Sequence, residues 1–388
     1  MAVDGWSEAE FRAKWEEAAA DVGRFNLAIF GKTGVGKSTL INAVFGEDLA
    51  PTGIGQPVTM DSRLYQHPAV GPLGIYDTRG LEIGADTEDL IRDLDELIQA
   101  KNALPLFERI HVAWYCVRAG DRRFEDTEAE LIRRLHAVGL PVIVVLTQVP
   151  TRDERYHPDA LELAEHITSL GLPIVGGRPV LVMASGDEFR GEASHGLKEL
   201  VDATFRAAPE GTAHALAAAQ RVDLERKRKQ AIVVISAASA AAAAIGAVPI
   251  PIADAGLLVP VQLTMVAKIS QIFRVRLGTA AVAAAVVPSL ATSAGRAVVA
   301  GLLKVIPGAG AIVGGIVSAG TASVVTGAMG YAWLTVSEQL TLGRFKGVDG
   351  APDKAAIGEL FSAEFKQWFA RLLPGRGKAA AGASEERA

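Results

Sequence analysis

Eight residues near the N-terminus have the types and the spacing that bind phosphate. Residues 31–38 read GKTGVGKS, which fits the pattern G-x-x-x-x-G-K-[ST]. Glycines let backbone N–H groups turn toward phosphate oxygens, and the positive end of the following helix adds to the attraction. The apolar run NLAIF before the motif and STLINAVFG after it supply the strand–loop–helix context that the motif requires. We expect Lys37 to reach the β- and γ-phosphates and Ser38 to ligate Mg²⁺. The predicted nucleotide contacts in this segment are Gly31, Lys32, Thr33, Gly34, Val35, Gly36, Lys37, Ser38 and Thr39.

Two further segments follow in the order that contacts to a γ-phosphate need. Asp77 ends the apolar run LGIYD and is followed by Thr-Arg-Gly. A strand-end Asp can hold Mg²⁺ through water, and Gly80 can offer its N–H to the γ-phosphate. Thr59 lies where a threonine would close on both the metal ion and the γ-phosphate, with Thr52 as its competitor. The predicted metal ligands are Ser38, Thr59 and Asp77, and the predicted catalytic residues are Thr59, Arg79 and Gly80.

Together these motifs resemble the G domain of Era-like GTPases of the translation-factor class, and the P-loop also resembles that of septin-related GTPases. The resemblance covers about residues 25–208 and implies GTP and GDP as ligands, with Mg²⁺, and hydrolysis of GTP to GDP and phosphate. Leu81 stands where Ras-like enzymes place a water-orienting Gln. We therefore expect slow intrinsic hydrolysis that rises on self-association or with a partner. Arg79 is either an arginine finger acting across a homodimer of G domains or an ordinary surface arginine.

The segment expected to read guanine departs from that family. The pattern [NT]KxD should follow the strand PVIVVLT, but the chain has Thr147, then Gln, Val and Pro. Asp153 comes three residues late, and Asp187 follows the stretch MASG. The predicted contacts on this side are Thr147, Gln148, Asp153, Ala184 and Ser185. GTP remains the predicted ligand, and the alternative is a relaxed base preference that would admit ATP.

The elements that must position these residues alternate between short apolar runs and helical patterns from residue 25 to 208. This alternation predicts an α/β domain with a mainly parallel sheet covered on both faces. Helices are expected at 38–46, 87–100, 125–138, 158–170 and 194–206. Residues 1–24 should form an N-terminal helix, opened by a capping box of Ser7 and Glu10 and packed on the domain that follows.

A second, all-α domain is predicted over residues 209–373. The charge-free run that follows ERKRK is long enough to span a bilayer, and two more charge-free stretches lie at 277–295 and 305–337. Small residues recur every four positions in the last stretch, as in closely packed membrane helices. The segment resembles the hydrophobic helical domain of YcjF-type inner-membrane proteins. We expect membrane contact through residues 231–337, and the alternative is a tightly packed soluble bundle.

An apolar stripe over residues 360–373 is either an interfacial helix or a cap on one of the domains. Residues 374–388 have no apolar periodicity and are expected to be disordered.

Composition limits the function further. The net charge of −5 argues against a nucleic-acid partner. The single cysteine excludes a disulfide framework within one chain and favours a reducing compartment. The charged N-terminus does not read as a signal peptide. The sequence therefore predicts a cytoplasmic protein at the inner face of the cell membrane, acting as a nucleotide-dependent switch. A soluble, self-assembling nucleotide-binding scaffold with little turnover is the alternative.

Overall fold

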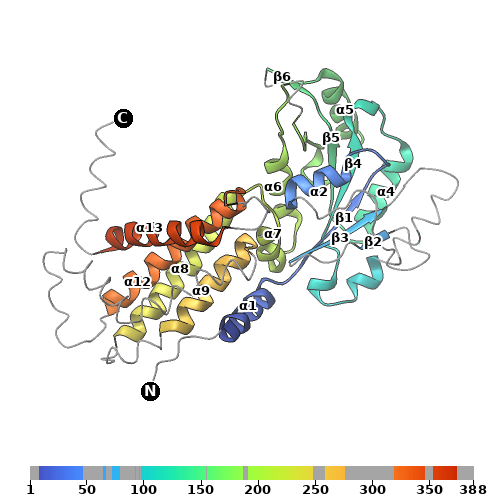
Figure 1. Cartoon of the computed structure of the whole chain (residues 1–388). Helices are drawn as coiled ribbons and strands as arrows, with labels where there is room; N and C mark the ends of the chain where they lie inside the picture. The colour runs from blue at the N-terminus through green and yellow to red at the C-terminus, as the bar shows by residue number, and fades with distance from the viewer. Residues whose placement is uncertain are drawn as a thin grey trace, which may run out of the picture. The chain divides into compact units, whose positions relative to one another are not determined.

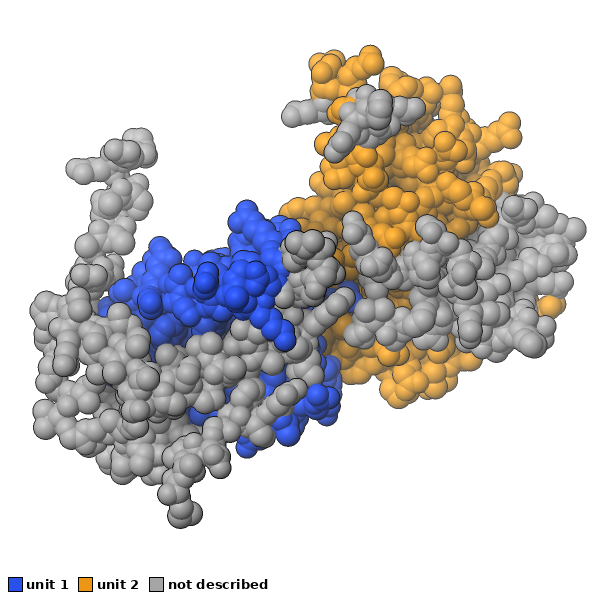
Figure 2. All heavy atoms as spheres, in the orientation of Figure 1, with its two compact units in different colours: residues 1–21, 224–388 blue, residues 22–223 orange. Residues whose placement is uncertain are grey.

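A computed structural model of the chain describes residues 8–46, 64–66, 72–78, 92, 96, 98–153, 155–186, 191–247, 258–275, 319–345 and 353–373 (Figure 1). The chain divides into two compact units. Residues 22–223 form the sheet unit, and residues 1–21 together with 224–388 form the helical unit (Figure 2).

The sheet unit is built on six strands in the order β2-β3-β1-β4-β5-β8. Neighbours from β3 to β8 run parallel, and β2 joins the edge antiparallel. The strands are β1 (Phe25–Phe30), β2 (Leu64–Gln66), β3 (Leu73–Thr78), β4 (Val112–Arg118), β5 (Val142–Thr147) and β8 (Val180–Leu181). A separate hairpin pairs β6 (Thr151–Arg152) with β7 (Arg155–Tyr156). The predicted α/β class with a mainly parallel sheet is confirmed.

Helices cover both faces of this sheet, which explains why its strands are continuously apolar. Along β1, Leu27 and Ile29 join one core, whereas Ala28 and Phe30 join the other. The first face carries α2 (Lys37–Phe45), α6 (Leu197–Ala207) and α7 (Ala213–Ala219), and the second carries α4 (Asp126–Ala137) and α5 (Pro158–Ser169). Short 3₁₀ turns lie at η1 (Leu106–Glu108), η2 (Ala119–Asp121), η3 (Val175–Gly177) and η4 (Glu210–Thr212).

The chain leaves the sheet unit through a fixed turn. Gln220 is fully buried, and its side chain both accepts from Asp223 N at 2.7 Å and donates to Asp223 O at 3.0 Å. Between them, Arg221 N donates to Val44 O, in the last turn of α2, at 2.8 Å. The compact sheet unit therefore runs to Asp223, beyond the predicted domain end at residue 208, because α7 packs into the core of the sheet.

The helical unit packs around α12. Helices α8, α9 and α13 each contact α12. The polar contacts between these helices include Trp333 Nε1, which donates to Ser270 Oγ at 2.8 Å, and Arg228, which pairs with Glu338 at 2.9 Å. The bounds are α8 (Leu224–Gly246), α9 (Val259–Phe273), α12 (Ala319–Thr341) and α13 (Lys354–Leu372).

The apolar stripe predicted on the last helix lies inside this unit. Phe361, Phe365 and Phe369 of α13 are buried in the same core as Trp333. Of the two interpretations that the sequence left open, α13 is therefore a packed helix of the bundle.

The N-terminal helix α1 (Glu8–Val22) packs elsewhere than predicted. Phe11 and Ala18 lie in the core of the helical unit. Gln271 Nε2 of α9 donates to Trp15 O at 3.3 Å, and Lys268 pairs with Asp21 at 3.0 Å. The prediction that this helix packs on the following domain was wrong. Periodicity identified the buried face of the helix but not the partner of that face.

Within the part of the chain that the structure describes, one helix, α8, is long and apolar enough to cross a bilayer, on length and composition alone. Its buried side includes Ala231 and Ile235, while Val233 is 68% exposed. The charge-free stretch at 277–295, most of the stretch that begins at 305, and the tail 374–388 lie outside the described residues.

The packing of α1 can be tested with Phe11→Ala. Truncating this fully buried ring should destabilise the helical unit by about 3–5 kcal/mol, because it leaves a cavity in that core. Hydrogen exchange measured by segment should then show lost protection in α9 and α12 and unchanged protection in the sheet strands. Glu17→Ala, at an exposed position of the same helix, is the control. Lost protection in the strands instead would contradict the observed packing.

Candidate functional site

The loop between β1 and α2 can form only with glycine at two positions. At Gly31, φ is 132°, and a side chain there would collide with the carbonyl oxygen of Cys116 on β4. At Gly36, the residue that precedes α2, φ is 94°, in the left-handed region. These two residues turn the loop back over the end of the sheet and start α2 at Lys37. The first turn of a helix leaves backbone N–H groups without helical acceptors, and such groups attract an anion.

Lys37 lies across this loop. Its Nζ donates to Gly31 O at 2.7 Å and to Lys32 O at 3.1 Å. Ser38 follows on the first turn of α2 and is half-buried. An ammonium group beside a row of backbone N–H donors is the arrangement that binds a polyphosphate.

A network of charged side chains that the sequence did not reveal connects Lys32 of the loop to the start of α4. Lys32 Nζ lies 2.7 Å from Glu125 Oε1 and 3.9 Å from Glu128 Oε1. Glu125 and Glu128 form the capping box of α4, with Glu125 N donating to Glu128 Oε2 at 2.8 Å. Tyr115 OH donates to Glu128 at 3.2 Å. The motif leaves position 32 free to vary, so the E-x-x-E spacing at the start of α4 was the one available signal.

Burial shifts the pKa of two groups in this network, Glu128 and Tyr115. It raises the pKa of the Glu128 carboxyl, against the opposing effect of its hydrogen bond from the Glu125 backbone and the charge of Lys32. Burial and the neighbouring Glu128 also raise the pKa of Tyr115 well above its ordinary value. Tyr115 therefore remains a neutral hydrogen-bond donor beneath the loop.

The end of β5 is fastened to the same loop. Thr147 is buried, and its hydroxyl lies 2.6 Å from Val35 O and 3.2 Å from Val117 O. Gln148 adopts a left-handed φ of 53°, and its Nε2 donates to Gly34 O at 3.3 Å. Both residues thus contact the backbone of the phosphate loop, which places the segment after β5 directly beside it.

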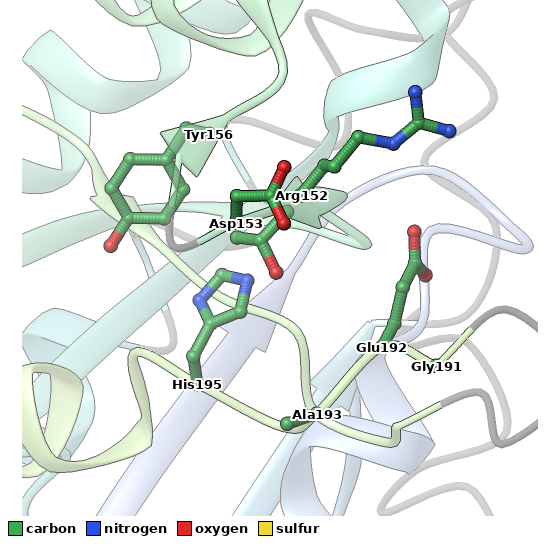
Figure 3. Close-up of a pocket in the computed structure, with 8 residues that line it drawn as sticks. Arg152, Asp153, Tyr156, Gly191, Glu192, Ala193 and His195 are labelled. Atoms are coloured by element: carbon green, nitrogen blue, oxygen red, sulfur yellow. The ribbon is translucent and has the colours of Figure 1, made fainter.

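Beyond this segment lies a pocket of about 760 Å³ (Figure 3). The β6–β7 hairpin forms one wall and residues 191–195 form the other. Asp153 lies in the turn of the hairpin with φ of 50°. His195 crosses to the β5 side, where its Nε2 lies 3.0 Å from Val149 O. The lining residues are Thr151, Arg152, Asp153, Tyr156, Gly191, Glu192, Ala193 and His195.

The remaining predicted residues divide between those described and those outside the description. Asp77 pairs in register with Ile29, two residues before Gly31, so its backbone lies at the phosphate-loop edge of the sheet. Ala184 and Ser185 follow β8 at the same edge. Thr52, Thr59, Arg79, Gly80, Leu81 and Asp187 lie outside the described residues.

Comparison with known families matches the two parts of the chain separately. Residues 26–148 match the family described as 50S ribosome-binding GTPase. Residues 212–353 match a domain of unknown function, DUF697. The chain joins a P-loop GTPase G domain to a DUF697 domain.

Among curated proteins, the G domain is similar to GTPase Der. The protein of Brucella abortus is 31% identical over 199 residues, which cover 48% of this chain and 38% of the relative. That of Nitrobacter winogradskyi is 32% identical over 191 residues, covering 48% of this chain and 36% of the relative. The chain thus spans less than two-fifths of the length of these relatives.

Solved structures are similar at lower identity. Era of Aquifex aeolicus bound to GDP·AlF₄⁻ is 24% identical, with a TM-score of 0.31, over 48% of this chain and 58% of that one. The FeoB G-domain of Methanococcus jannaschii is 20% identical, with a TM-score of 0.26, over 48% of this chain and 98% of that one.

The contact between β5 and the phosphate loop of the G domain can be tested with Thr147→Val. The change should cost roughly 1–3 kcal/mol of stability, because it leaves buried carbonyl oxygens without their donor. Nucleotide affinity should fall at the same time, because the loop loses its support. Thr147→Ser, which keeps the hydroxyl, should restore both in thermal unfolding and nucleotide titration. Equal behaviour of the Val and Ser variants would show that the hydroxyl does not support the loop.

Proposed function

We propose that this protein binds GTP with Mg²⁺, hydrolyses it slowly and acts as a nucleotide-dependent switch at or near a membrane. The observation that carries the proposal is the shape of the loop over residues 31–38. Its backbone closely approaches β4 at Gly31 and accepts a hydrogen bond from Thr147 of β5, the Lys32 side chain pairs with Glu125 at the start of α4, and Lys37 lies across the loop. A loop held on three sides presents its N–H groups without reorganisation, which is what tight phosphate binding requires.

The Mg²⁺ site would draw on residues next to this loop. Ser38 lies on the first turn of α2, where its hydroxyl is close to phosphates held by the loop. Asp77 ends the neighbouring strand, and Thr59 is proposed to close the site from the connection between α2 and β2. When bound, Mg²⁺ neutralises charge that develops on the phosphate oxygens. These are hard oxygen ligands of the kind that Mg²⁺ prefers.

Slow turnover follows from what the chain offers the attacking water. Leu81 stands where Ras-like enzymes place a Gln, and its side chain has no polar atom that could orient the attacking water. Thr59, Arg79 and Gly80 are the proposed catalytic residues, and Arg79 would act best across a homodimer of G domains. Hydrolysis should then depend on protein concentration, which separates this mechanism from a scaffold with little turnover.

Lys37→Ala tests nucleotide binding and turnover together. The variant should lose at least roughly a hundredfold in affinity for GTP and GDP, because a charge-assisted phosphate contact disappears. Wild-type phosphate release per molecule should rise with protein concentration, whereas the variant should stay at background at each concentration. Unchanged binding in Lys37→Ala would overturn the proposal. If the wild type binds nucleotide but releases almost no phosphate at any protein concentration, the result would favour the scaffold with little turnover.

Membrane contact is proposed for the exposed side of α8. Between its buried positions, Val233, Ala237, Ala240, Ala241 and Ala244 are exposed and carry no charge. Two of the four basic residues at the start of the helix bond to other helices of the helical unit. Lys227 is buried and donates to Ile272 O at 2.6 Å, and Arg228 pairs with Glu338. The apolar face of α8, together with the DUF697 match, therefore supports membrane contact more than the basic run does.

Val233→Glu tests this face. A carboxylate at an exposed position in the apolar face should reduce sedimentation of the full chain with phospholipid vesicles several-fold, because a charge opposes burial in the bilayer boundary. The control is Leu161→Glu, a leucine 44% exposed on α5 of the sheet unit. Equal sedimentation of the two variants and the wild type would contradict membrane contact through α8.

A second candidate function comes from the description of the matching family, which names binding to the 50S ribosome. Co-sedimentation of the full chain with ribosomal subunits in the presence of GTP would support it. The net charge of −5 opposes it, because nucleic-acid surfaces attract basic partners.

A further inference from the structure

The segment that borders the phosphate loop, residues 148–150, carries neither the Lys nor the Asp of the guanine-recognition pattern. The amide of Gln148 donates to Gly34 O. Val149 is fully buried, and Pro150 carries no polar atom. A carboxylate that recognises guanine would therefore have to come from a neighbouring element.

The walls of the pocket behind the β6–β7 hairpin are bonded to this segment. Val149 O lies 3.0 Å from His195 Nε2, and His157 N, just past the hairpin, donates to Pro150 O at 3.0 Å. Backbone bonds in both directions join His195 to Met183, after β8. The walls of the pocket thus begin at the ends of β5 and β8, the edge where ligands of open α/β sheets bind.

The contact of His195 with Val149 O identifies which ring nitrogen donates. A carbonyl oxygen can only accept, so Nε2 carries the hydrogen that it donates to Val149 O. In the neutral ring, Nδ1 is then an acceptor. That atom is buried and has no hydrogen-bond partner within the described ranges. The ring of Tyr156 lies 5.3 Å from that of His195, and the two rings form one side of the pocket (Figure 3).

The other groups of the pocket are mainly acceptors too. The exposed carboxylate of Asp153 has no hydrogen bond or ion pair with any residue that the structure describes. Asp153 extends from the hairpin between the two rings and Glu192 (Figure 3). Arg152 extends from the same hairpin, away from the rings (Figure 3). The pocket therefore matches a flat ligand whose edge carries adjacent donors.

We propose that this pocket recognises the base of the bound nucleotide and selects guanine through Asp153. Guanine carries two adjacent donors, N1–H and the 2-amino group, which one carboxylate can accept together, whereas adenine offers one donor beside an acceptor. Tyr156 and His195 provide the surface against which the base lies. This inference rests on the nucleotide binding proposed above. It assigns the selectivity to a hairpin outside the segment in which the sequence pattern would place it.

The test is competition of nucleotides against a fluorescent GDP on the full chain. Wild type should prefer GTP to ITP, which lacks the 2-amino group, and to ATP. Asp153→Asn should weaken GTP roughly tenfold or more and leave ATP unchanged, because only the paired donors of guanine lose their acceptor. XTP should bind the variant more tightly than wild type, since an amide can donate to the C2 carbonyl of xanthine. Asn also tolerates the left-handed backbone at position 153, so the turn should be kept.

Two further variants complete the test. His195→Gln keeps a donor for Val149 O but removes Nδ1, and should reduce the preference for GTP over ATP several-fold. Glu162→Gln changes a carboxylate of α5 that is 79% exposed and does not line the pocket, and should change nothing. If Lys37→Ala abolishes binding while Asp153→Asn and His195→Gln keep the wild-type ratio, the pocket inference fails and the proposed function stands. If Lys37→Ala binds like wild type, both fail.

Discussion

The buried hydroxyl of Thr147, at the end of β5, connects this strand to the phosphate loop and to the end of β4. It lies within hydrogen-bond distance of a carbonyl of the loop, Val35 O, and of one at the end of β4, Val117 O. Buried carbonyls need a donor, so the end of β5 fixes where the loop can run. Gly31 packs against the carbonyl of Cys116 on β4. The loop therefore takes its shape from two neighbouring strands as much as from its own glycines.

Connectivity attaches both ends of the sheet unit to the two elements that flank this loop, β1 and α2. The chain enters from α1 through Gly23 and Arg24 into β1, which runs directly into Gly31. It leaves at the turn after α7, which is bonded to the last turn of α2. Because α1 and α8 both belong to the helical unit, the G domain is an insertion between two parts of one bundle. Each covalent connection to the bundle therefore adjoins β1 or α2, the two elements that flank the phosphate loop.

The sequence predicted what depends on local chemistry. The phosphate loop needs its glycines and Lys37 in a fixed order, and buried parallel strands need unbroken apolar runs, so both were readable. Contacts between distant segments were not. Lys32 with Glu128, and Phe11 with the bundle, join residues whose separation carries no periodicity. The apolar run RPVLVMA, residues 178–184, forms a strand only at Val180–Leu181, because the chain beyond it turns to bond Val149 and His195. That turn forms part of the pocket wall, and no sequence motif predicts it.

The start of α8 constrains how the helical unit could meet a membrane. Burying an ammonium group is costly unless it is hydrogen-bonded, and Lys227 meets that need at Ile272 O, near the end of α9, beside the Phe273 ring. Arg228 forms its two bonds with Glu338 of α12. If α8 left the bundle, these partners would be exposed to solvent or lipid without their cations. For the membrane contact proposed above, these bonds favour a mode in which α8 keeps its buried side in the bundle and presents the side that carries Val233 to the lipid.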